Sequence, residues 1–131
     1  MYPLEDDHHC FVCGEKNASG LRLSFSLRDG KVASEFVLHK AYQGYKDIVH
    51  GGLISAILDE AMVKAALMEG TPAVTAEMTV RFRHPLFIGE KGIVEASVLK
   101  THRKIIEASA IIKKPDQTVI AEGTAKLLRQ G

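Results

Sequence analysis

The fold of this chain depends on residues 50–69, which read HGGLISAILDEAMVKAALME. Gly51 and Gly52 follow His50 at the start of the stretch, and Gly70 and Pro72 come after it, as is typical of the two ends of a helix. On a helical wheel with about 100° per residue, the large apolar side chains share one broad arc. These side chains are Leu53, Ile54, Ile57, Leu58 and Met62. The stretch therefore predicts a helix over about residues 51–69 with a broad apolar face.

The acidic residues of this helix do not share one stripe. Glu60 and Lys64 are four residues apart and form a pair suited to solvent. Asp59 instead projects among small or apolar side chains, namely Ser55, Ala56, Val63 and Ala66. Such groups solvate a carboxylate poorly, so a carboxylate among them is a candidate for catalysis. The same pattern also fits a charge at the rim of a subunit contact, paired with an arginine.

A helix that is apolar on two sides needs a cover on both. Its own sheet supplies one cover. The simplest second cover is another copy of the same helix, so we expect a homo-oligomer.

The segment before the helix predicts two strands. Residues 21–28 alternate apolar and polar side chains, a pattern typical of a strand with one buried face. Asp29-Gly30 is typical of a type I′ hairpin turn, which leads into a second strand over residues 31–38. Residues 39–49 have no sustained period and are expected to form a loop.

The segment after Pro72 predicts four strands. In the first of them, strict alternation places Thr75 on the polar face. A type I turn at Lys114-Pro115-Asp116-Gln117 precedes the last strand. The four strands are expected at residues 74–83, 91–100, 104–113 and 118–128. Two strands, one helix and four strands indicate a single α+β domain.

Composition narrows the class of protein. The 131 residues, 46% of them hydrophobic, suit one domain, for which we expect a leader over residues 1–20 and a body over 21–131. The net charge of +1 comes from 17 basic and 16 acidic residues spread along the chain, which disfavours a nucleic-acid partner. No apolar run suits a signal peptide or a membrane span, so we expect a soluble, cytoplasmic protein without a membrane partner.

The leader contains a Cys-x-x-Cys pair, Cys10 and Cys13. In a reducing compartment this pair suggests metal or redox chemistry before a structural disulfide. Turn-forming residues follow the pair, which disfavours a thioredoxin-like helix. His8 and His9 adjoin it, but two cysteines supply only half of a zinc shell, which leaves a zinc shared between subunits as an alternative. Ordinary packing is the favoured interpretation, and we assign no metal and no cofactor.

Residues 43–61 and 75–85 resemble hot-dog-fold thioesterases of the phenylacetate-pathway type, a branch of the 4-hydroxybenzoyl-CoA thioesterase superfamily. That branch has His-Gly-Gly at the start of its central helix and an acidic residue nine positions after the histidine, which fits His50 and Asp59. Residues 10–21 are similar to a leader found in one subset. The resemblance implies a long helix wrapped by a six-stranded antiparallel sheet. It also implies a homodimer or homotetramer with active sites between subunits.

The resemblance further implies an enzyme that hydrolyses a small or medium acyl-CoA, aliphatic or aryl, to free acid and CoA. Asp59 would act as nucleophile or general base, and the Gly51 N–H of the opposite subunit would polarise the carbonyl. Residues expected near the carbonyl or the attacking water are His50, Gln43 and Thr75. Each of these three also fits a structural place, as a hydrogen-bonding histidine, an ordinary loop glutamine or a solvent-facing threonine. Residues expected to bind the substrate are Gly52, Ser55, Val63, Arg81, Arg83 and His84.

Three other functions compete with this hypothesis. A non-catalytic acyl-CoA-binding hot-dog module would need no carboxylate beside the thioester, so Asp59 favours the hydrolase. A zinc-dependent interaction protein would be built on the two cysteines. A hot-dog dehydratase generally has a different motif at the start of the helix.

Overall fold

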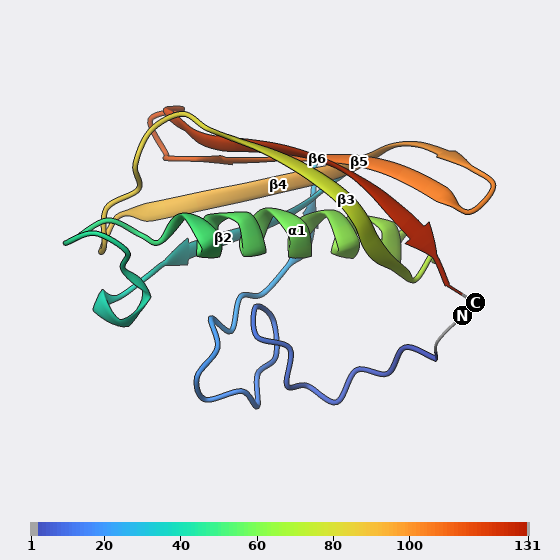
Figure 1. The fold of residues 1–131 in the computed structure, drawn as a ribbon, viewed down its shortest axis with the longest axis horizontal. Helices are drawn as coiled ribbons and strands as arrows, with labels where there is room; N and C mark the ends of the chain where they lie inside the picture. Colours follow the sequence, from blue (N-terminus) through green and yellow to red (C-terminus); the bar gives the residue numbers. More distant parts are fainter. Residues whose placement is uncertain (1–2, 131) are drawn as a thin grey trace.

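The computed structural model describes residues 3–130, so the outermost residues of the expected leader (1–20) and body (21–131) lie outside the described part. One helix, α1 (Gly51–Met68), packs on one face of a six-stranded antiparallel sheet with the order β1-β2-β4-β5-β6-β3 (Figure 1). The strands are β1 (Ser26–Arg28), β2 (Lys31–Val37), β3 (Ala73–Phe82), β4 (Lys91–His102), β5 (Ile105–Lys113) and β6 (Val119–Arg129). The predicted fold class and element order are confirmed.

The core lies between α1 and the sheet. Ile57, Leu58 and Met62 are fully buried, as the helical wheel predicts. They pack against a sheet face to which β4 and β5 contribute every second residue, including Val94 and Ile112. Each such side chain contributes roughly 1.5–3 kcal/mol when it leaves water, which fixes the helix on the sheet. Among residues 3–130, no helix has the length and apolar character needed to cross a membrane.

The first hairpin has the predicted turn but a shorter first strand. Asp29 and Gly30 have φ angles of 52° and 76°, and a type I′ turn requires a positive φ at both positions. Only residues 26–28 pair with β2, so the strand predicted over residues 21–28 was wrong for most of its length. Leu21 and Leu23 donate their N–H groups to the leader instead. The alternation in the sequence reflects packing under the leader and not pairing in the sheet.

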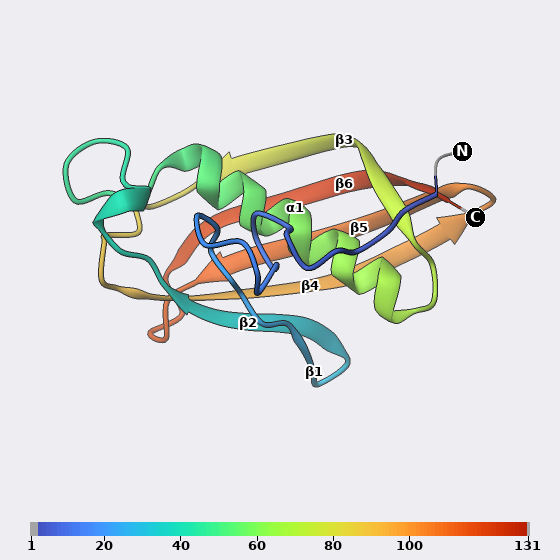
Figure 2. The same ribbon diagram turned by 90° about the horizontal axis from the view of Figure 1, so that it is seen from below.

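The leader, defined here as residues 3–20, forms a third layer. Figures 1 and 2 show it crossing α1 on the side opposite to the sheet. Val12 is only 6% exposed and belongs to the core, and the Tyr42 hydroxyl donates to the carbonyl of Gly20 at 2.8 Å. The outer side of the helix is therefore covered in part by the same chain, where we expected a second copy.

The sheet ends in two different edges. β1 is three residues long, whereas β3 has ten residues and pairs only with β6 in the described part of the chain. The outer edge of β3 therefore offers a long row of backbone groups for pairing.

Candidate active site

Asp59 lies half-buried in the middle of α1 and accepts a hydrogen bond from the Thr75 hydroxyl at its Oδ1 atom. The register of β3 against β6 shifts between Thr75 and Glu77, which leaves Ala76 as an extra residue. This β-bulge turns Thr75 from the outward face, where strict alternation places it, to the face that packs on the helix. Thr75 accordingly lies opposite Leu127, which is fully buried. The bulge brings the two side chains together.

The second carboxylate oxygen of Asp59 has no hydrogen-bond partner within residues 3–130. Ser55 and Val63, each one helical turn from Asp59, are half-buried beside it on α1. Asp59 is thus held by one oxygen while the other remains available. An available carboxylate oxygen can accept a proton from water or attack an electrophilic carbon.

His50 caps the start of α1. Its Nδ1 atom accepts the Gly52 N–H at 2.8 Å, and its carbonyl accepts the N–H groups of Leu53 and Ile54. The Gly51 N–H has no partner within residues 3–130. One donor of the first turn is therefore left free at the positive end of the helix dipole, as an oxyanion requires.

Packing within the chain does not demand glycine at position 51. A Cβ there would lie 3.5 Å from the ring of Phe82, an ordinary contact, and the position is exposed. At Gly52 a Cβ would lie 3.1 Å from His50 Nδ1, which is tight against the cap. The space above Gly51 is therefore open to a ligand.

The loop before the helix forms the wall of a hollow of about 550 Å³ that reaches from Gln43 to Gly51. The Gln43 Oε1 atom accepts the N–H of Asp47 at 3.0 Å, and the Gln43 amide nitrogen has no partner among the described residues. Gln43 and His50 also line a second hollow of about 710 Å³, which opens toward Phe11 of the leader. Both side chains border the open space at the start of the helix.

The predicted basic residues lie near the end of β3. Arg83 pairs with Glu122, with its Nε and Nη2 atoms each 2.9 Å from the carboxylate, and His84 Nδ1 lies 2.9 Å from the Val119 carbonyl. Arg81 has no partner within residues 3–130 and lines a shallow depression together with Arg83. Because Phe82 adjoins Gly51, these groups share one end of the molecule with the helix start.

The model of the family described as "Thioesterase superfamily" matches residues 46–121, more than half of the chain. The chain belongs to the thioesterase superfamily. The predicted resemblance to hot-dog thioesterases, and with it the prediction of a thioester hydrolase, is confirmed.

Individual relatives agree with this membership. Human acyl-coenzyme A thioesterase 13 is 27% identical over 108 residues, which are 81% of this chain and 72% of the relative. A crystal structure of a thioesterase superfamily protein has a TM-score of 0.88 at 23% identity, covering 98% of this chain and 68% of that one. The PaaI protein of the Escherichia coli phenylacetic acid degradation operon has a TM-score of 0.78 at 22% identity, with coverage of 85% and 81%. Both of these solved structures have the same fold as this chain.

The candidate carboxylate and the candidate oxyanion donor do not meet within one chain. Gly51 and Asp59 are eight residues apart on α1, which separates them by about 12 Å along the helix axis. A general base and an oxyanion donor each act at about 3 Å from the groups they serve. One subunit alone therefore cannot apply both to one thioester carbon.

A second cluster lies on another side of the same helix. Cys10 and Cys13 of the leader and Glu60 of α1 present ligand atoms that all lie within 4.8 Å of one another. Burial, followed by hydrogen bonding to Glu60, raises the pKa of the Cys13 thiol to about 12. Glu60, which we predicted to face solvent, is half-buried because the leader lies against it. No local pattern reveals that contact, which joins residues fifty positions apart.

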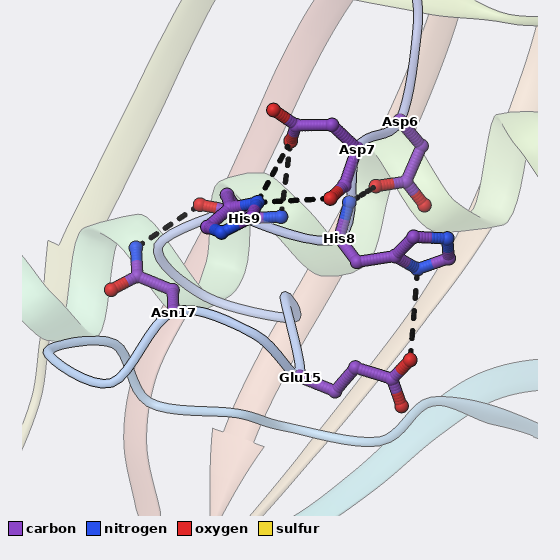
Figure 3. A network of polar contacts seen from close by, with 6 residues as sticks. All are labelled: Asp6, Asp7, His8, His9, Glu15 and Asn17. Atoms are coloured by element: carbon purple, nitrogen blue, oxygen red, sulfur yellow. Dashed lines mark hydrogen bonds and ion pairs between the residues drawn. The ribbon is translucent and has the colours of Figure 1, made fainter.

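The two leader histidines do not belong to this cluster. Figure 3 shows His8 directed at Glu15, with Nδ1 3.8 Å from the carboxylate, and His9 held by Asp7, with Nδ1 2.9 Å from its carbonyl oxygen. Asn17 donates to the His9 carbonyl at 3.0 Å. Both histidines therefore contact other leader residues at the exposed surface and not the two cysteines.

Proposed function

We propose that this thioesterase hydrolyses acyl-CoA to a free acid and CoA, with Asp59 as the reacting carboxylate. The observation that carries the proposal is the contact between Asp59 and Thr75, which a bulge in β3 directs onto the helix. The name of the human relative, an acyl-coenzyme A thioesterase, supports the choice of substrate. Small or medium acyl chains, aliphatic or aryl, are the proposed range.

Asp59 has two possible roles in the reaction, and both suit its surroundings. As a general base it takes a proton from water while that water attacks the thioester carbon. As a nucleophile it attacks the carbon itself, expels CoA and forms a mixed anhydride that water then hydrolyses. In either role the Thr75 hydroxyl fixes one oxygen and leaves the other for the reaction.

The proposed oxyanion donor is the Gly51 N–H of the opposite subunit. The free edge of β3 supports such a dimer, because two β3 strands can pair antiparallel about a twofold axis and extend the sheet. Antiparallel pairing sets the start of one β3 beside the end of the other. The start carries Thr75 next to Asp59, and the end carries Phe82 next to Gly51. This arrangement overcomes the separation of about 12 Å along one helix.

The substrate would lie across this shared edge. Gln43, with its free amide nitrogen, and Gly52 adjoin the carbonyl position, and His50 orients the helix start by capping it. Arg81 and Arg83 supply positive charge for the CoA phosphates, with His84 beside them. Ser55 and Val63 flank the carboxylate. A dimer or tetramer and a cytoplasmic location belong to the same proposal.

A panel of acyl-CoA esters tests the function, with released CoA measured by a thiol reagent and a substrate-free control for the protein's own cysteines. We expect turnover of at least one ester and a fall of at least about a hundredfold in Asp59→Asn. A protein that binds acyl-CoA tightly but releases no CoA would instead be the non-catalytic binding module. Sedimentation at micromolar concentration tests whether the site is shared between subunits. A fully active monomer would disprove a shared site.

A further inference from the structure

The cluster of Cys10, Cys13 and Glu60 joins two segments that are far apart in the sequence. The Cys10 Sγ atom lies 3.5 Å from Glu60 Oε2, and all three ligand atoms lie within 4.8 Å of one another. In a tetrahedral zinc site, bond lengths of about 2.3 Å to sulfur and about 2.1 Å to oxygen set these two ligand atoms about 3.6 Å apart. The spacing of Cys10 and Glu60 therefore matches that of two ligands around one ion.

The backbone around the two cysteines forms a tight turn. The Gly14 N–H donates to the Cys10 carbonyl at 2.8 Å, and the Cys13 N–H lies 3.4 Å from Cys10 Sγ as a donor. A Cβ at Gly14 would lie 2.3 Å from the Cys10 nitrogen, so only glycine fits this turn. Donation from the backbone to sulfur is a contact that stabilises a thiolate ligand. The turn thus holds both sulfurs on one side before any ion binds.

We propose that Cys10, Cys13 and Glu60 bind a zinc-class divalent cation that fastens the leader to α1. Thiolates select zinc over magnesium or calcium, and a carboxylate is a regular third ligand. Water fills the fourth position. Within residues 3–130 these three residues form the one group of at least three potential ligands.

The alternatives explain less of the cluster. A disulfide between Cys10 and Cys13 would account for the two sulfurs but not for the carboxylate that faces them. Ordinary packing would place a half-buried carboxylate against two thiols, which are only weak hydrogen-bond donors. A bound cation supplies the charge that such a group needs. The site is separate from the proposed chemistry, because Glu60 faces the leader whereas Asp59 faces β3.

Metal analysis of the full chain, purified without a polyhistidine tag, tests the proposal. We expect about one zinc per chain in the wild type and a loss of most of it in Cys13→Ser and in Glu60→Gln. The matched control is His9→Ala, which alters a neighbouring leader residue outside the cluster and should keep the metal. A chelator should lower the melting temperature of the wild type by about 5 °C or more and leave that of Cys13→Ser unchanged.

Cobalt substitution in the wild type gives a second readout that does not depend on the folding of any variant. Two thiolate ligands should produce sulfur-to-cobalt charge-transfer absorption together with the bands of tetrahedral cobalt. A reduced wild-type protein that binds neither zinc nor cobalt would overturn the proposal. So would a metal-free protein whose mass shows a Cys10–Cys13 disulfide, and full metal content in Glu60→Gln would remove Glu60 from the ligand set.

Discussion

Asp59 and Glu60 are consecutive residues of α1, but they lie against different parts of the molecule. Asp59 meets the Thr75 hydroxyl of β3, beside the free edge of the sheet. Glu60 meets Cys10 of the leader, on the side of the helix away from the sheet. Consecutive helical side chains diverge by about 100°, so one helix can present two carboxylates to two environments. The helix uses one side for the proposed chemistry and the other for attachment of the leader.

The largest effect on turnover is expected from a substitution at Asp59. Asp59→Asn keeps the side-chain volume but removes the base or nucleophile, so turnover should fall at least about a hundredfold. The melting temperature should change by less than about 3 °C. Turnover of acyl-CoA and thermal melts on one preparation measure both. Activity within a few fold of wild type would move the catalytic role to another residue.

Gly51→Val should lower turnover about a hundredfold, because loss of one oxyanion donor costs on the order of 3 kcal/mol. The branched side chain blocks the approach of the carbonyl without touching Asp59. Gly51→Ala is the matched control, since its Cβ meets Phe82 at an ordinary 3.5 Å and the fold should persist. A stable Gly51→Val protein with undiminished turnover would exclude the oxyanion role.

Thr75→Val tests whether the hydroxyl that the bulge places beside Asp59 contributes to turnover. The change removes the hydroxyl that fixes Asp59 and keeps the shape, so turnover should fall about tenfold, equivalent to about 1.4 kcal/mol. Thr75→Ser retains the hydroxyl and should restore most of the rate. Equal rates for the valine and serine variants would show that the contact has no part in the reaction.

The smallest effect on turnover is expected from a substitution at Glu60. Glu60→Gln should change turnover by less than about threefold, while the melting temperature falls by about 5 °C as the leader loosens. This pattern is the reverse of the one expected for Asp59→Asn. Melting temperatures and turnover rates of the two variants measure this pattern. A Glu60 variant that loses turnover but not stability would show that Glu60 belongs to the same site as Asp59.

The sequence predicts the elements of this fold well because their signals are local. The helix was predicted over about residues 51–69 and spans Gly51–Met68, and the Asp29-Gly30 turn has the expected positive φ angles. The pattern from His50 to Asp59 identified the family. Local periodicity and capping carry this information without reference to the rest of the chain.

Contacts between distant segments are what the sequence hides. The bulge at Ala76 arises from the register of β3 on β6, so strict alternation places Thr75 on the wrong face. The partial burial of Glu60 and the loss of strand pairing over residues 21–25 both follow from the path of the leader. None of these features has a local signature.

The pairing of β3 with β6 also sets the order in which the molecule can be completed. Thr75 is aligned by Leu127, far later in the chain, whereas α1 precedes β3 directly. During synthesis α1 and Asp59 emerge well before β6, the strand that aligns Thr75. The pairing of β3 cannot form until β6 has been made. A nascent chain therefore holds Asp59 without the aligned hydroxyl, and activity should appear only after β6 has joined the sheet.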